Sequence, residues 1–291
     1  MNGFLVIDKP GGMTSHDVVY KVRKRLGTKR VGHAGTLDPM ATGVLVVGVG
    51  NATKLMQYIV DGSKSYDATI ALGVATHTDD KEGETIFTAE PHLVSAITDQ
   101  QVRTEIAKFV GTIMQKPSSV SAIKIDGKAA HKRVRDGEIV ELPAREVNIS
   151  NISVHTFEHT ENAALVRITV DCSAGTYIRS IARDLGEILK VGGHLTALRR
   201  TLVSPFALDE AGSIEEAELI DTADGISRVL PIRTLDFSEM NEISFGRSIG
   251  TNPTDGIHAA LSPTGGFAAL LLNKEQGGKM VAAPTLVAVK E

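Results

Sequence analysis

Glycine and proline divide this chain into many short apolar runs, and this spacing limits the architectures open to it. The 291 residues include 28 Gly and 10 Pro, which excludes a long coiled coil or a largely disordered chain. No run approaches the roughly 18 to 20 apolar residues of a membrane-spanning helix, and the first ten residues lack the pattern of a signal peptide. The single cysteine, Cys172, excludes an internal disulfide and suits a reducing compartment. We therefore expect a globular, cytoplasmic protein without a membrane segment.

Helical and strand patterns follow one another irregularly along the first two hundred residues. Residues 66–72 alternate apolar and polar side chains, as a half-buried strand does, whereas Val18, Val22 and Leu26 recur at helical spacing. Because no regular βαβ alternation is present, we predict an α+β fold with a mixed, mostly antiparallel sheet flanked by helices. Further strands are predicted at 4–6, 44–49 and 164–172, helices at 15–26, 51–60, 98–110 and 177–188, and a hairpin at Asp126–Gly127. We expect Ser15 to cap the first of these helices and Gly27 to end it, and Thr98 with Gln101 to form a capping box at the start of the third.

The pattern changes beyond residue 230. Ser213 and Glu216 form a capping box that predicts a short acidic helix. From Ile232 onward, short apolar runs are separated by glycines, which is typical of a small all-β unit. We predict two domains, at 1–230 and 231–291.

Charge is distributed unevenly, although the net charge is only −4. Residues 207–291 hold 6 Lys and Arg against 13 Asp and Glu, which leaves 25 against 22 for residues 1–206. Two basic clusters stand out, at 21–30 and 116–135. These clusters suit a polyanion despite the negative net charge. Salt screens distant charges, so a phosphate responds mainly to the charges within about 10 Å of it. Solvated helix faces are the alternative interpretation.

Motifs for common cofactors are missing from the sequence. A Walker A lysine, a nucleophile elbow and a His-Glu-x-x-His metal motif do not occur, and the Gly48–Thr53 segment has Thr where a dinucleotide fingerprint requires its third Gly. The acidic run between His77 and Glu84 could hold a hard cation, but we interpret it as a solvated loop because it lacks the pattern of a calcium loop. We expect no metal and no nucleotide or redox cofactor.

The densest constellation of special residues lies at 32–43, with the sequence GHAGTLDPMATG. Three glycines and a proline make this segment too broken for a helix or a central strand, and a predicted buried strand follows it directly. A rigid loop that presents one carboxylate, Asp38, is a common way to build a site on a scaffold. The alternative is that Asp38–Pro39 simply initiates a turn.

This loop resembles the catalytic loop of pseudouridine synthases, and specifically that of the TruB family. Five further motifs occur in the order that the family has them, so the resemblance covers about residues 3–205. They are Asp8-Lys9-Pro10-x-Gly12-Met13-Thr14-Ser15, Lys64-x-Tyr66, Leu72-Gly73, Ser121-Ala122-x-Lys124 with Gly127, and Cys172-Ser173-x-Gly175-Thr176-Tyr177-Ile178-Arg179 with Asp184-Leu185-Gly186.

The resemblance implies an isomerase that converts one uridine in the TΨC arm of tRNA, at position 55, into pseudouridine. The N1–C1′ glycosidic bond breaks, the uracil rotates, and a C5–C1′ bond forms. Asp38 matches the catalytic aspartate, Arg179 the arginine that pairs with it, and Tyr66 the active-site tyrosine that stacks on the target base. Three roles stay open for Asp38: attack on C1′, addition to the base, or removal of a C2′ proton. For Arg179 the alternatives are a salt bridge with Asp184 or a contact to phosphate.

Further residues are assigned to substrate binding by the same resemblance. His33 matches the residue that fills the space of an extruded base, and Tyr177 a second ring lining the pocket, with a role in the apolar core as the alternative for Tyr177. Lys9 either supports the catalytic loop or contacts a phosphate. Lys132 and Arg133 belong to the second basic cluster, which is placed to grip the backbone of the arm. The C-terminal unit resembles a PUA-like domain in place and size.

Two other functions compete with this interpretation. An RNA-binding or RNA-folding protein could use the same surface without turnover. A nucleoside or glycoside hydrolase would need a second carboxylate about 5 to 10 Å from Asp38, and no motif supplies one.

The sequence also departs from the family pattern, with Ser118 in place of a second proline, Val120 in place of an aromatic residue and His131 in place of tyrosine. No apolar interface stripe demands a dimer, so a monomer is expected.

Overall fold

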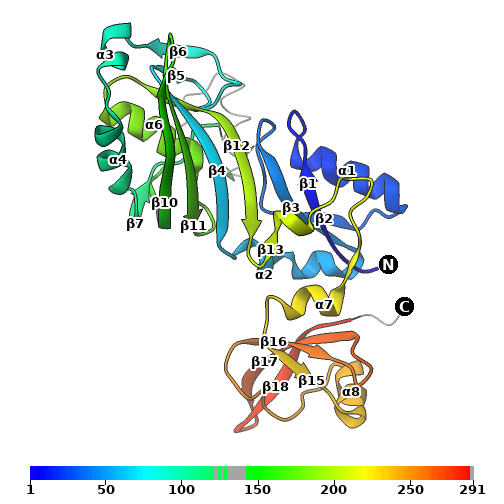
Figure 1. Ribbon diagram of the computed structural model, residues 1–291. Coiled ribbons are helices and arrows are strands. Elements are labelled where there is room, and N and C mark those ends of the chain that lie inside the picture. The colour runs from blue at the N-terminus through cyan, green and yellow to red at the C-terminus, as the bar shows by residue number, and fades with distance from the viewer. Residues whose placement is uncertain (121–123, 126–127, 130–141, 289–291) are drawn as a thin grey trace.

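The computed structural model has a large mixed sheet with helices packed on it and, below it, a smaller unit with a sheet of its own (Figure 1). It describes residues 1–120, 124–125, 128–129 and 142–288. The amino terminus lies at one edge of the large sheet, beside β1, and the described chain ends in the smaller unit (Figure 1).

Ten strands form the large sheet, in the order β14-β1-β3-β12-β4-β11-β10-β7, with β2 paired to β3 and β13 to β12. All pairs are antiparallel except β3 with β12, so the prediction of a mixed, mostly antiparallel sheet is confirmed. The strands are β1 Gly3–Lys9, β2 Val31–Ala34, β3 Thr42–Val49, β4 Lys64–Leu72, β7 Gly111–Gln115, β10 Arg145–His159, β11 Ala164–Cys172, β12 Gly193–Val203, β13 Phe206–Ala207 and β14 Ile220–Asp221.

Two short hairpins stand outside this sheet. One pairs β5 (Val74–Thr76) with β6 (Thr85–Thr88), and the other pairs β8 (Lys124–Ile125) with β9 (Lys128–Ala129). The second lies where the Asp126–Gly127 turn predicts a hairpin, although the turn residues themselves are outside the described residues.

The helices begin and end largely where capping chemistry requires. Thr14, rather than the expected Ser15, caps α1 and forms a capping box with Asp17, and Gly27 ends the helix in a left-handed conformation. The capping box of Thr98 and Gln101 forms as predicted. The expected helix from Asn51 is a 3-10 turn, η1, followed by one short helix, α2. The helices are α1 Ser15–Leu26, η1 Gly50–Leu55, α2 Met56–Val60, α3 Pro91–Ser95, α4 Asp99–Ala107, α6 Ile178–Ile188, η2 Leu208–Glu210, α7 Thr222–Ser227 and α8 Phe237–Ser244.

Alternation along the strands produces two apolar cores, one on each face of the sheet. On β1, Leu5 and Ile7 face the core shared with α1, α4 and α6, whereas Phe4 and Val6 face the core shared with α2 and α7. The second core also includes Leu270 of the smaller unit, so the two units share this core.

The smaller unit has a four-stranded sheet in the order β15-β16-β17-β18, and its first strand begins at Ile232. The unit also contains α8, which the expectation of an all-β unit omits. Asp236 and Glu239 form the capping box that starts this helix. The strands are β15 Ile232–Thr234, β16 Ile257–Leu261, β17 Phe267–Gln276 and β18 Lys279–Val287.

The prediction of a short acidic helix after Ser213 is wrong. Ser213 and Glu216 do form their capping bonds, but the chain makes only one turn there. Arg25 of α1 donates to the carbonyls of Ile214 and Ala217, at 2.9 Å each, and so takes acceptors that a longer helix would use.

No helix among the described residues is both long and apolar enough to cross a lipid bilayer.

A buried glycine of α6 sets how closely that helix approaches β12. A Cβ added at Gly186 would lie 2.2 Å from the carbonyl carbon of Gly192 and 2.2 Å from the nitrogen of Gly193. We expect Gly186→Ala to destabilise the fold by about 1–3 kcal/mol despite the better helix propensity of alanine. Gly32→Ala is the control, because its Cβ would meet nothing nearer than 3.9 Å. Urea denaturation of both variants tests this, and equal stability of the two would contradict the packing argument.

Candidate active site

The loop that carries Asp38 joins β2 to β3 and is held from several sides. Ser15, buried at the start of α1, donates to the carbonyl of Leu37 and accepts from its N–H, at 3.1 and 2.9 Å. The carbonyl of Asp38 accepts from Ala41, and that of Pro39 accepts from Gly12. These bonds fix the backbone on both sides of the carboxylate.

Lys9 lies beneath this loop and is fully buried. Its Nζ donates to the carbonyls of Pro10, Met13 and Pro39, at 2.9, 2.6 and 3.3 Å. Burial lowers the pKa of Lys9 to about 8. Of the two sequence-based roles for Lys9, this placement favours support of the loop over contact with a phosphate.

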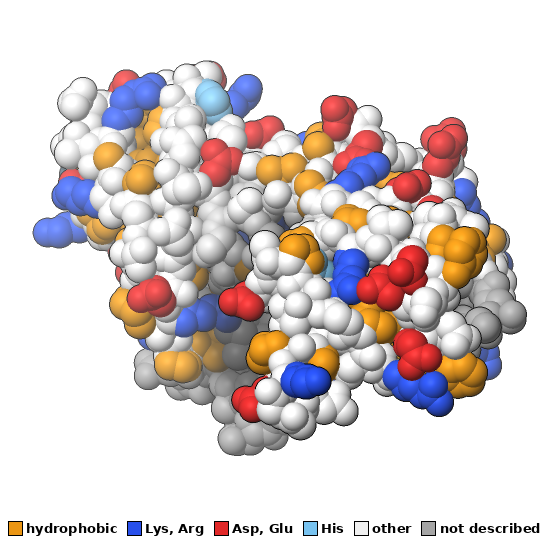
Figure 2. Space-filling view, turned by 90° about the horizontal axis from the view of Figure 1, so that it is seen from below, with side chains coloured by type: hydrophobic (Ala, Val, Ile, Leu, Met, Phe, Trp, Pro, Cys, Tyr) orange, Lys and Arg blue, Asp and Glu red, His pale blue; other side chains and the backbone are white. Residues whose placement is uncertain are grey.

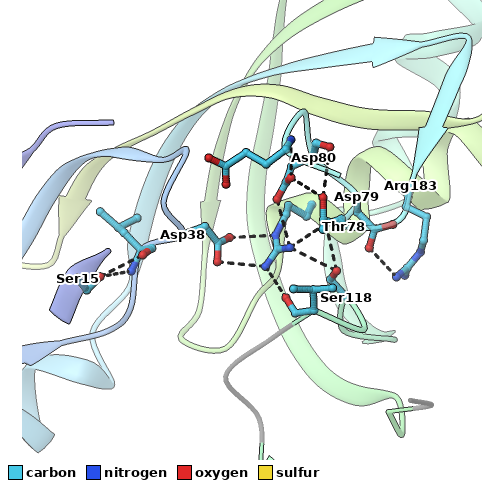
Figure 3. A network of polar contacts seen from close by, with 11 residues as sticks. Ser15, Asp38, Thr78, Asp79, Asp80, Ser118 and Arg183 are labelled. Atoms are coloured by element: carbon cyan, nitrogen blue, oxygen red, sulfur yellow. Dashed lines mark hydrogen bonds and ion pairs between the residues drawn. The ribbon is translucent and has the colours of Figure 1, made fainter. Parts of the chain in front are cut away.

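Asp38 and Arg179 form a two-point ion pair (Figure 3). Nε of Arg179 lies 2.9 Å from Oδ2 of Asp38, and Nη2 donates to Oδ1 at 3.1 Å. The arginine side chain is 4% exposed and the aspartate side chain 33%. Arg179 follows Tyr177 at the start of α6, so the helix directs the guanidinium toward the loop. The alternative pairing of Arg179 with Asp184 does not form, because Asp184 pairs with Arg183.

The remaining donors of Arg179 meet two other segments of the chain (Figure 3). Nη1 donates to the carbonyl of Thr78 at 2.7 Å and lies 3.3 Å from Oδ2 of Asp80. Nη2 also donates to the carbonyl of Val120 at 2.9 Å. One buried side chain therefore joins the Asp38 loop, the turn around residue 78 and the segment that ends at residue 120.

The interpretation of the acidic run as a solvated loop is wrong for two of its members. Asp79 and Asp80 are both buried. Asp80 accepts from Thr78 Oγ1 at 2.5 Å and from the Glu82 N–H at 3.0 Å, besides its pairing with Arg179. Oδ2 of Asp79 lies 3.5 Å from Nη1 of Arg183. No group of three or more metal-ligating side chains with suitable geometry occurs among the described residues.

A cavity of about 260 Å³ opens over the ion pair. Its walls contain four basic side chains and, among the described residues, one carboxylate, that of Asp38. A polyanion therefore finds a favourable potential at this opening. The lining residues that matter here are Asp38, Lys64, Tyr66, Arg145, Tyr177, Arg179, Leu198 and Arg200.

Two aromatic side chains, those of Tyr66 and Tyr177, line the cavity. Tyr66 stands on β4, almost completely buried, and burial raises the pKa of its hydroxyl, so the phenol is neutral at pH 7. Tyr177 caps α6, and the guanidinium of Arg145 lies 4.9 Å from its ring centre. The side chain of Gln115 accepts from the backbone N–H of Tyr177 and donates to its carbonyl, and these two bonds fix the backbone of Tyr177.

Opposing influences act on the Asp38 carboxyl. Loss of water raises its pKa, the nearby Arg179 lowers it, and the negative Asp80 raises it again. The net effect is a pKa above the usual value for aspartate. The guanidinium is therefore the main group that favours the ionised form.

His33 does not line this cavity. It lies on β2, and its ring packs edge-on against that of His16, with 5.6 Å between ring centres. Burial, His16 and Arg200 lower the pKa of His33 to about 4, so its ring is uncharged at neutral pH. Lys132 and Arg133 lie outside the described residues.

Part of the first basic cluster has a structural role. Arg23 donates to the carbonyl of Val31, and Arg25 binds the two carbonyls described above. Lys21, Lys24, Lys29 and Arg30 are exposed. Only these last four stay candidates for contacts to phosphates.

Comparison with known proteins gives the family. A model described as "TruB family pseudouridylate synthase (N terminal domain)" matches residues 23–178, and one described as "tRNA pseudouridylate synthase B C-terminal domain" matches residues 179–228. The chain belongs to the TruB family. It is therefore a pseudouridine synthase, which is an isomerase.

Relatives of similar length support this TruB-family assignment. The chain is 51% identical to "tRNA pseudouridine synthase B" of Corynebacterium diphtheriae, over 96% of this chain and 94% of that one, and 48% identical to the protein of the same name from Arthrobacter sp., over 99% and 96%. A chain of "Structure of H/ACA RNP bound to a substrate RNA containing 2'-deoxyuridine" has the same fold, with a TM-score of 0.71 at 21% identity, over 99% of this chain and 85% of that one. A chain of "Crystal structure of the archaeal box H/ACA sRNP Nop10-Cbf5 complex" gives 0.68 at 21%, over 98% and 85%.

Sequence reasoning did not identify Arg200 and Asp80 as parts of the site. Arg200 is buried on β12, where Nε donates to the carbonyl of Val44 at 2.7 Å and Nη2 to that of Gly35 at 3.1 Å. It therefore closes the cavity beside Tyr66, its register partner on β4. A charged residue between the apolar residues of 195–203 is the signal that could have pointed to it.

Replacing Arg179 should change the pH dependence of the TruB-family reaction. Activity that needs ionised Asp38 falls as the pH drops through the pKa of this group, and Arg179 lowers that pKa. We therefore expect the acid limb of kcat/KM to move upward by about one pH unit or more in Arg179→Met. Arg179→Lys, which keeps the charge, should move it less. Identical acid limbs in the two variants would contradict the electrostatic role.

Proposed function

We propose that this protein converts the uridine at position 55, in the TΨC arm of tRNA, into pseudouridine, and that it does so as a monomer in the cytoplasm. The N1–C1′ bond breaks, the uracil rotates, and C5 joins C1′. The hydrogen on C5 leaves to a base or to solvent, and N1 takes up a proton, so the uridine keeps its composition.

The observation that carries this proposal is a single carboxylate, paired with a guanidinium, in a cationic cavity. Asp38 is the only carboxylate among the described residues that line it; it pairs with Arg179, and the buried ring of Tyr66 belongs to the same wall lining. We assign catalysis to these three residues: Asp38 acts on the reacting uridine, Arg179 keeps Asp38 ionised and oriented, and the Tyr66 ring packs against the base. Tyr177 provides a second wall for the base.

The cavity dimensions support an extruded nucleotide as the occupant. A volume of about 260 Å³ is large enough for one base with its ribose but not for a stacked helix. The target must therefore leave the stack, which costs a few kcal/mol. We assign His33, uncharged and next to the loop of Asp38, to the space that the extruded nucleotide vacates.

Hydrolysis of a glycosidic bond is less well supported. Glycosidases use two carboxylates on opposite sides of the bond. Asp80, the nearest candidate, is buried behind Arg179 and does not line the cavity. The described walls therefore offer no second carboxylate to activate water.

Tritium release tests the proposed reaction. With tRNA carrying 5-tritiated uridine and no added metal or cofactor, wild type should release one equivalent of tritium per tRNA, because the new C5–C1′ bond expels that hydrogen. Asp38→Asn should reduce the release by at least about a thousandfold, since the amide is neutral. tRNA with cytidine at position 55 is the substrate control.

Each other outcome has a clear meaning. Binding of tRNA without release by wild type would favour an RNA-binding protein. Free uracil as a stoichiometric product would favour a hydrolase. Release from the position-55 cytidine control would place the target elsewhere in the tRNA.

The salt dependence of binding tests the role of the second basic cluster. Each phosphate contact that is lost lowers the slope of log Kd against log salt by about one. The double variant Lys132→Ala and Arg133→Ala should therefore bind tRNA more weakly and with a slope lower by about two. Lys274→Ala with Lys279→Ala, in the smaller unit, is the matched control of equal charge. A slope equal to that of wild type would place the RNA elsewhere.

A further inference from the structure

The outward face of α1 carries an exposed tyrosine ring between a histidine and an arginine. Tyr20 is 68% exposed, although the opposite side of the same helix is buried. His16 lies four residues before Tyr20 and Arg23 three residues after it, so the three side chains are neighbours on one face. We call these three residues the α1 flank.

The α1 flank is tied to the active-site loop. The His16 ring packs edge-on against His33 of β2, and Arg23 donates to the carbonyl of Val31 at the start of β2. Ser15, next to His16, is bonded to Leu37, which directly precedes Asp38. The position of Tyr20 relative to Asp38 is therefore set by hydrogen bonds at both ends of the flank.

The charge around the flank suits an RNA partner. Lys21, Lys24, Lys29 and Arg30 are exposed nearby, and within the described part of the chain none of them forms an ion pair. The one acidic residue of this helix, Asp17, is engaged in the capping box with Thr14. A single exposed ring among cations offers little apolar area to a protein partner, whereas it matches a base and its phosphates.

The face seen from below makes a useful contrast. Acidic and basic side chains are interspersed there, without a large area of one sign (Figure 2). The smaller unit also has an exposed aromatic residue, Phe237, which is 79% exposed at the start of α8. The helix of Phe237 contains no Lys or Arg, whereas α1 carries several.

We propose that the α1 flank is a second recognition surface for the RNA substrate, on which the Tyr20 ring stacks against an unpaired base near the target uridine. The exposed lysines and Arg30 hold the adjacent phosphates, and His16 continues the surface toward His33. This inference rests on the proposed function. It adds a base-stacking contact outside the cavity that holds the target.

Fluorescence can test the contact directly, because the chain contains no tryptophan. Tyr20→Trp introduces a single tryptophan, which can be excited selectively, on the flank, and Phe237→Trp introduces one at a similarly exposed position on α8. Saturating unmodified tRNA should quench the emission of Tyr20→Trp by about half or more and leave Phe237→Trp nearly unchanged. Equal quenching of both, or no quenching of either at saturation, would overturn the inference.

Affinity provides the second measurement. Tyr20→Ala should raise the Kd for tRNA and the KM about tenfold, the effect of one lost base–ring contact. Tyr20→Phe should keep wild-type affinity because it keeps the ring, and Phe237→Ala should bind as wild type does. Tyr20→Ala with wild-type Kd would overturn the inference while tritium release by wild type still supported the proposed function. Failure of wild type to release tritium would instead overturn the function itself.

Discussion

The guanidinium of Arg179 is the interaction on which the organisation of this site depends. An isolated charge buried to this extent costs several kcal/mol, so it is tolerated only when its donors are matched. The partners of Arg179 come from the Asp38 loop, from Thr78 and Asp80, and from Val120. The loops around the cavity must therefore fold together onto the start of α6, and the same contacts that stabilise the arginine orient the carboxylate.

Backbone carbonyls are the partners of most buried cations near the site. Lys9 and Lys64 each donate to carbonyls of turns, with Lys64 reaching Val60 and Gly62 at 2.7 Å, and Arg200 donates to Val44 and Gly35. These contacts hold irregular segments in place without neutralising the positive charge. The cavity consequently stays cationic, which favours phosphates at its mouth. A count of basic residues in the sequence therefore overstates how many are available for RNA.

Local patterns were sufficient to predict much of the fold. The alternation of residues 66–72, the capping box at Thr98 and the glycine after α1 all act within a few residues, so their structural outcome follows from the sequence. The longest strand, β10, was missed because polar residues occupy most of its length and its pairing with β11 contains two register shifts. The Ser213 turn failed to extend because Arg25, which is far away in sequence, takes its carbonyls.

The residues of the candidate site also fall into two groups: those that local sequence reveals and those that depend on tertiary contacts. Asp38 stands out because its loop is unusual in composition, and its neighbours in sequence define that loop. Asp80 and Arg200 do not stand out, because the role of a buried charge depends on partners that are distant in sequence. The ion pair at the centre of the site shows this distance, since Arg179 lies 141 residues after Asp38. The acidic run was misinterpreted for this reason: Asp79 and Asp80 have the composition of a solvated turn, and only the arrival of Arg183 and Arg179 from α6 makes their burial favourable. In this fold, the roles of charged residues are set by tertiary contacts, whereas the roles of glycines and caps are set locally.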